Sequence, residues 1–141
     1  MKYLDIDRFW AYLGASAIAF FEPITAVIVW VFIFVLSDMI SGMYASLKEG
    51  RHLESHKMQK TVIKTIMYSS CIILLHGIDT YMVTIMDCGF AKTGSAIICG
   101  IELYSIFENF YRATGNKVFK ILTTFTLNKI KDKTGVDLEE K

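Results

Sequence analysis

The sequence predicts an all-α integral membrane protein, and three observations lead to that fold class. The chain has 141 residues, of which 53% are hydrophobic, and its mean hydropathy is +0.41. The apolar residues are clustered in long runs, and the chain contains a single proline. Three runs reach about 20 residues, the length that an α-helix needs to cross a bilayer. We therefore expect one membrane domain, residues 1–141, built as a helical bundle.

Each run is expected to form one helix, and a shorter apolar run comes before the first span. This run, residues 9–21, is separated from the first span by Glu22-Pro23. Because proline fits the first turn of a helix and breaks a helix interior, we start the first span there. We expect the short run to form a separate helix that folds against the first span, with a fourth crossing as the alternative. The three expected spans cover residues 24–45, 62–86 and 90–111.

The polar segments differ in basic charge, and this difference predicts how the chain crosses the membrane. The linker, residues 46–61, and the tail, residues 112–141, are rich in Lys and Arg, whereas the connection between the second and third spans has only Lys92. Since cytoplasmic loops carry the basic excess, we expect the linker and the C-terminus in the cytoplasm. The side of the N-terminus stays open, because it depends on whether the chain crosses three or four times. The basic residues of the linker are Lys48, Arg51, Lys57 and Lys60.

The tail is expected to form an amphipathic helix. Val118, Ile121, Leu122 and Phe125 recur at helical spacing among lysines and threonines. This pattern fits a helix that lies on the membrane surface, and it fits equally a cytoplasmic helix that packs on its neighbours.

The third span carries acids in a segment that otherwise suits lipid. At about 100° per residue, Glu102, Ser105, Glu108 and Asn109 fall within one arc of about 120°. An acidic side chain at the centre of a membrane helix costs roughly 2.5 kcal/mol or more, so this stripe is expected to face water or other helices. It either lines a water-filled path or forms a helix–helix contact. Whether the two glutamates are ionised or neutral stays open.

The other two spans also carry polar residues on one face. Asp38, Ser41 and Gly42 share a face near the end of the first span, where an acid is either buried or partly hydrated. In the second span, His76 and Asp79 are three residues apart. We expect them to form an intramolecular polar pair, with a proton relay as the alternative, because two ligands are too few for a metal site.

We expect no lysine or arginine to pair with these acids deep in the membrane, because Lys64 and Arg112 lie at the ends of their spans. Packing, protonation, water or oligomerisation must then satisfy the acids. This reasoning favours a homo-oligomer over an isolated monomer.

Several kinds of function find no support in the sequence. Cys71, Cys88 and Cys99 form no CxxC motif and are expected to be small apolar packing residues. There is no nucleophile–base set, phosphate loop or metal cluster, so we expect no enzyme, no cofactor and no metal. The net charge of only +1 gives no reason to expect nucleic acid as a partner.

Three motifs occur in a fixed order along the chain. The first is DMISG at residues 38–42, the second is a serine followed by spaced lysines within residues 55–60, and the third is ELYSIFEN at residues 102–109. Together they resemble a phage holin family, the one shared with toxin-secretion holins, over roughly residues 9–120. The third motif is the most specific, because it follows the family's third-span pattern E-x-x-S-[IL]-x-E-N.

The resemblance implies a multi-pass protein of the bacterial cytoplasmic membrane that oligomerises and permeabilises that membrane. Its expected partners are the lipid bilayer, further copies of itself, and an endolysin or exported toxin as cargo. The polar faces of the spans would then form the subunit contacts or line the pore. Two alternatives remain, a regulated small ion or proton channel and a non-enzymatic scaffold that recruits a soluble partner.

Overall fold

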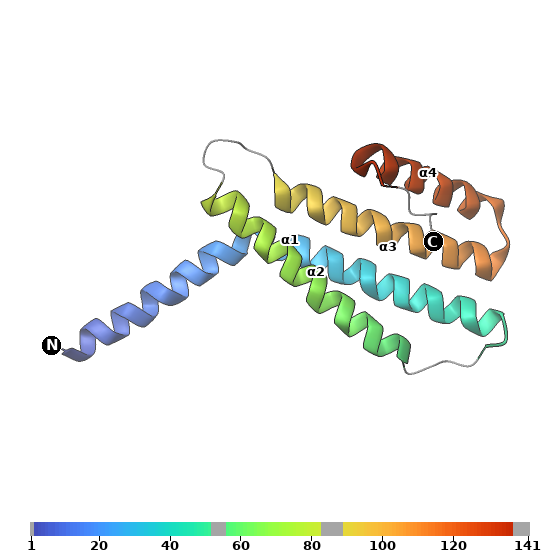
Figure 1. Ribbon diagram of the computed structural model, residues 1–141. Coiled ribbons are helices and arrows are strands. Elements are labelled where there is room, and N and C mark those ends of the chain that lie inside the picture. The colour runs from blue at the N-terminus through green and yellow to red at the C-terminus, as the bar shows by residue number, and fades with distance from the viewer. Residues whose placement is uncertain (1, 52–55, 83–88, 137–141) are drawn as a thin grey trace.

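The computed structural model describes residues 2–51, 56–82 and 89–136, and within these ranges it consists of four α-helices (Figure 1). The predicted all-α membrane bundle is confirmed. Three of the helices are long and apolar enough to cross a membrane. The helices are α1 (Lys2–Lys48), α2 (His56–Tyr81), α3 (Phe90–Thr114) and α4 (Lys117–Thr134).

The longest helix, α1, corrects the helix break expected at Glu22-Pro23. It continues for 47 residues with Pro23 inside it, so residues 9–21 do not form a separate helix that folds against the first span. Proline removes one backbone hydrogen bond and kinks the helix. Figure 1 shows the axis of α1 changing direction between its two halves. A helix that continues through the kink keeps its remaining backbone bonds, which matters in lipid because an unsatisfied backbone group there is costly.

The second half of α1 packs with α2 and α3. Ile24, Val31 and Val35 lie on one side of α1 and are buried together with Ile72 of α2. Tyr68 packs against this core. The end of the bundle where α1 ends, α2 begins and α3 ends is called the linker end below.

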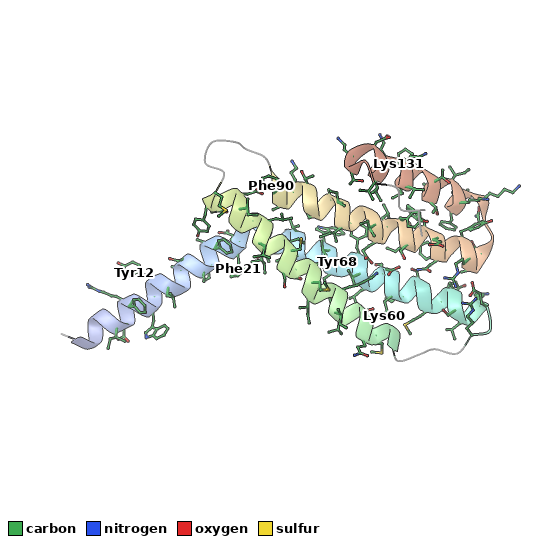
Figure 2. All side chains as sticks on the ribbon, in the orientation of Figure 1. Tyr12, Phe21, Lys60, Tyr68, Phe90 and Lys131 are labelled. Atoms are coloured by element: carbon green, nitrogen blue, oxygen red, sulfur yellow. The ribbon has the colours of Figure 1, made fainter. Side chains whose placement is uncertain are left out.

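Large apolar side chains cover much of the outer surface of the helices. Phe9 and Trp10 are exposed on the part of α1 that projects from the bundle, which also carries Tyr12 (Figure 2). On α2, Leu74 and Cys71 are exposed, so the expectation of a packed cysteine is wrong for Cys71. Cys99 is partly buried, and Cys88 lies outside the described residues. Lipid is the solvent that suits such a surface, because exposed apolar patches of this kind are rare in soluble monomers.

The tail helix α4 folds back along α3. Gly115 ends α3 with a positive φ of 67°, and the Asn116 side chain caps α4 by accepting a hydrogen bond from the Val118 N–H. The chain therefore reverses within two residues, and Ile130 of α4 reaches Gly100 of α3. Of the residues expected on the apolar face, Val118, Ile121 and Phe125 are exposed, while the residues buried against α3 are Thr126, Leu127 and Ile130.

Two glycines give a matched test of the contact between α2 and α3. An alanine Cβ at Gly94 would overlap Leu75, whereas a Cβ at Gly77 would meet nothing within 4 Å among the described residues. Gly→Ala favours a helix by about 1 kcal/mol. We expect Gly77→Ala to raise the midpoint of thermal unfolding in detergent. Gly94→Ala is expected to gain less, because the end of the Leu75 side chain must move aside to admit the new methyl group. Equal midpoints for the two variants would contradict the close approach.

Candidate functional site

An ionic triad joins the three long helices. The Lys64 Nζ of α2 lies 3.1 Å from Asp38 Oδ2 of α1 and 3.1 Å from Glu102 Oε1 of α3. It also donates to Glu102 Oε2 at 3.1 Å. The exposed fraction of the side chain is 1% for Glu102, 16% for Asp38 and 40% for Lys64. One ammonium group therefore serves two carboxylates, and the triad of Asp38, Lys64 and Glu102 carries a formal charge of −1.

The triad corrects the expectation that no cation pairs with these acids. α2 begins at His56, so Lys64 lies more than two turns inside the helix rather than at its end. Its flexible apolar stem carries the ammonium group between the neighbouring helices. Asp38 of α1 and Glu102 of α3 are thus satisfied within one chain. They do not by themselves require an oligomer.

Tyr68 completes the environment of Glu102. Its hydroxyl donates to Glu102 Oε1 at 2.9 Å, so the carboxylate accepts bonds from two residues of α2. Tyr68 was not singled out from the sequence, although its i+4 spacing from Lys64 places both side chains on one face. Within the described residues, no buried side-chain nitrogen or oxygen lacks a hydrogen-bond partner. This satisfaction is what makes a buried carboxylate tolerable, because a buried charge without partners would cost far more.

Asn109 links the triad to the polar face of α1. Its Nδ2 donates to Asp38 Oδ1 and to Ser41 Oγ, both at 3.1 Å. Gly42 permits this approach, since a Cβ at that position would lie 3.3 Å from Asn109 Nδ2. Two stripes predicted from the sequence, one on α1 and one on α3, therefore meet. We call Asp38, Ser41, Lys64, Tyr68, Glu102 and Asn109 the polar cluster.

The other two members of the stripe on α3 are placed differently. Ser105 lines a cavity beside the polar cluster, whereas Glu108 is exposed. The stripe spans about 120° of the helix, and the packing of α1 and α2 buries only the part that holds Glu102 and Asn109. Glu108 is therefore not a member of the polar cluster.

The cavity has a volume of about 400 Å³ and lies at the linker end of the bundle. Its lining is rich in cations. Arg51 and Arg112 both pair with Glu49, with closest N–O distances of 3.2 and 2.8 Å. Of the other basic residues predicted for the linker, Lys60 lines the cavity, Lys48 lies over the Tyr44 ring at 5.9 Å, and the side chain of Lys57 lies outside the described residues.

His76 and Asp79 do not form the expected polar pair, because each bonds to a different element. The carboxylate of Asp79 accepts the backbone N–H groups of Phe90 and Ala91 at 2.9 and 2.7 Å. It thereby caps the N-terminus of α3, where the first N–H groups have no partner within the helix. His76 Nε2 lies 3.1 Å from the carbonyl oxygen of Phe20, next to the kink at Pro23. Across residues 2–51, 56–82 and 89–136, no three His, Cys, Asp or Glu side chains are grouped to hold a metal ion.

The role of Asp79 as a cap gives a direct prediction. We expect Asp79→Ala to weaken the start of α3 by about 0.5–2 kcal/mol, the usual cost of losing a helix cap. Amide hydrogen exchange should become faster at Phe90 and Ala91, while exchange near the C-terminal end of α3 stays unchanged. Asp7→Ala, at an exposed position on the projecting part of α1, is the matched control. Unchanged exchange at Phe90 and Ala91 in Asp79→Ala would contradict the cap.

Comparison with known proteins identifies a family. Residues 16–132 match a family model described as the bacteriophage holin family. No curated protein sequence and no solved structure matches the chain. The matched range covers most of the four helices and contains every residue of the polar cluster and the cavity.

Proposed function

Because the chain belongs to the bacteriophage holin family, we propose that it assembles with copies of itself in the bacterial cytoplasmic membrane and permeabilises that membrane. It is a holin-like, multi-pass membrane protein, as its family and its three long apolar helices establish. The proposal adds oligomerisation, permeabilisation and a cargo, which is an endolysin or an exported toxin.

The inward placement of the polar cluster is the observation that carries the mechanism. Glu102, Ser41 and Asn109 are buried between helices, whereas Trp30 and Leu74 are exposed on the outside. An apolar exterior with its polar groups inside suits a single chain surrounded by lipid. The wall of a water-filled lesion needs the opposite arrangement. This conformation is therefore a closed one.

Opening then requires the three long helices to rotate or part, so that the polar cluster exchanges its partners for water or for a second copy. Breaking a buried ion pair costs about 3–5 kcal/mol, which keeps isolated chains closed. Clustered copies offset this cost, because polar side chains can bond across helices of neighbouring chains. Permeabilisation should therefore begin only above a threshold amount of protein.

We further propose that the linker and the C-terminus face the cytoplasm, on the basis of the charges of residues 46–61 and of Arg112. The packing of α4 bears on this orientation. Lys129 and Lys133 lie beside Lys92, at the end of α3 opposite the linker end. A cytoplasmic C-terminus therefore requires α4 to leave α3 in the membrane. Lys133→Cys, made in a background without the three native cysteines, should be labelled from the cytoplasmic side only. Labelling from outside would overturn this orientation.

The main test is expression in a bacterium with a potential-sensitive dye. Above the threshold we expect depolarisation and growth arrest. A membrane protein of similar size, expressed to the same level, serves as the control. Intact potential and normal growth at high expression would overturn the proposed function.

A regulated ion or proton channel is the second candidate, favoured by the single ammonium group that the triad shares between two carboxylates. Proteoliposomes separate the two functions. Release of a folded protein together with ions supports a lesion, whereas passage of ions alone supports a channel.

A further inference from the structure

The cavity at the linker end carries cations outside the triad, one of which, Arg112, also donates to Asn109 Oδ1 of the polar cluster at 3.4 Å. Its wall contains Arg51, Lys60 and Arg112 in addition to Lys64, which belongs to the triad. Arg51 and Arg112 share the carboxylate of Glu49, and no ion pair of Lys60 is found among the described residues. These three cations, which we call the basic rim, face two carboxylates, because Glu108 also interacts electrostatically with Arg112. The rim therefore has a formal excess of one positive charge.

The place of the basic rim in the fold matches the depth of lipid head groups. Arg51 follows α1, Lys60 is in the first turns of α2, and Arg112 is in the last turn of α3. Figure 2 shows Lys60 nearer the linker end of α2 than Tyr68. Because α1, α2 and α3 are long enough to cross the bilayer, their common end lies at the membrane–water interface. The phosphate groups of phospholipids occupy this layer.

The chemistry of the lining suits a phosphate group. Guanidinium groups bind phosphate oxygens through paired N–H donors, and an ammonium group adds a point charge. The triad, with its charge of −1, lies on the inner side of the cavity, so an anion is attracted to the rim and repelled from the polar cluster. A cavity of about 400 Å³ has room for a head group rather than for a whole lipid. Basic pockets between membrane helices bind anionic head groups in this way.

We propose that the basic rim binds the phosphate of an anionic phospholipid head group and thereby holds the ends of α1, α2 and α3 together. The bound lipid stabilises the closed bundle from its linker end. The site depends only on the three helices crossing the membrane. It does not depend on whether the chain permeabilises membranes, nor on which side the C-terminus lies.

The test uses the full chain in a neutral detergent and measures the midpoint of thermal unfolding. Phosphatidylglycerol, which is anionic, is compared with phosphatidylcholine, which has the same phosphate but no net charge. We expect phosphatidylglycerol to raise the midpoint by several degrees more than phosphatidylcholine. Native mass spectrometry should show at least fivefold greater retention of phosphatidylglycerol. Equal effects of the two lipids on the wild-type chain would overturn the proposal.

Two variants with the same loss of charge locate the site. Arg51→Gln/Lys60→Gln removes two cations of the basic rim, and Arg8→Gln/Lys117→Gln removes two exposed cations that do not line the cavity. The first pair should lose the preference for phosphatidylglycerol, and the second should keep it. Loss of the preference in both would overturn the site. If inorganic phosphate stabilised the chain as much as phosphatidylglycerol does, the proposal that the bound phosphate belongs to a lipid would be overturned.

Discussion

Lys64→Met is expected to destabilise the bundle strongly, although the substitution exchanges one long side chain for another. The change removes the only ammonium group bonded to Glu102 in the described part of the chain and leaves that carboxylate buried. Breaking a buried ion pair in this way costs about 3–5 kcal/mol, a large share of the stability of a small domain. The unfolding midpoint in detergent should fall sharply. Under the proposed function, cells should also depolarise at a lower level of protein.

Two further variants separate the ion pair from a general effect of losing a lysine. Lys60→Met, one turn earlier on α2, removes a cation that has no ion pair among the described residues. In detergent without added phospholipid, where the basic rim has no lipid to bind, it should change the midpoint little. Lys64→Met/Glu102→Met replaces the ion pair between α2 and α3 with apolar groups, while Asp38 keeps its bond from Asn109. This double variant should recover part of the lost stability, because replacing both members of a buried pair is often neutral. If Lys64→Met and Lys60→Met behaved alike, the triad would not hold the helices together.

The second large effect is expected at Glu102 and not at Glu108. Glu102→Gln keeps the shape of the side chain but removes the charge that Lys64 and Tyr68 bind, at a cost of about 1–3 kcal/mol. Glu108→Gln changes an exposed side chain and should stay within about 0.5 kcal/mol of the wild type. For both variants, the unfolding midpoint in detergent and the protein level at which depolarisation begins are measured. We expect the double variant to follow Glu102→Gln alone, and equal effects of the two single variants would contradict the burial pattern.

The membrane spans could be predicted because their signals are local. Hydrophobic length and helical phase follow from neighbouring residues, so the sequence predicts three spans and the polar faces of Asp38 and Glu102. Helical phase alone overestimated the buried stripe on α3. The part of the 120° arc that becomes buried depends on where α1 and α2 pack against α3. They cover Glu102 and Asn109 but leave Glu108 exposed.

The partners of the polar residues could not be predicted from spacing within one helix. The sequence pattern places Lys64 at the end of a span, yet α2 begins eight residues earlier, at His56. The Lys64 side chain therefore lies inside the bundle and bridges α1 and α3. His76 and Asp79 share a face of α2, but each finds a backbone partner on another helix, at Phe20 and at the start of α3. Backbone partners of this kind leave no trace in the sequence pattern.

The continuity of α1 is a further case in which the environment outweighs a local rule. Proline usually breaks a helix interior, and on that rule the sequence predicts a boundary at Pro23. In a membrane setting the remaining backbone bonds favour one kinked helix. The His76 contact with the carbonyl of Phe20 lies beside the kink.

The central claim is that the polar cluster holds α1 and α3 together in the closed state and that these helices must part for the membrane to open. A disulfide between Gly42→Cys and Asn109→Cys tests this claim, because a Cβ at position 42 would lie 3.8 Å from the Cγ of Asn109. In proteoliposomes of this variant, made in a background without the native cysteines, we predict no release of dye while the disulfide is intact. Release should begin when dithiothreitol is added, and the two single-cysteine variants should release dye with or without reductant. Equal release from the fully cross-linked and the reduced protein would contradict the account.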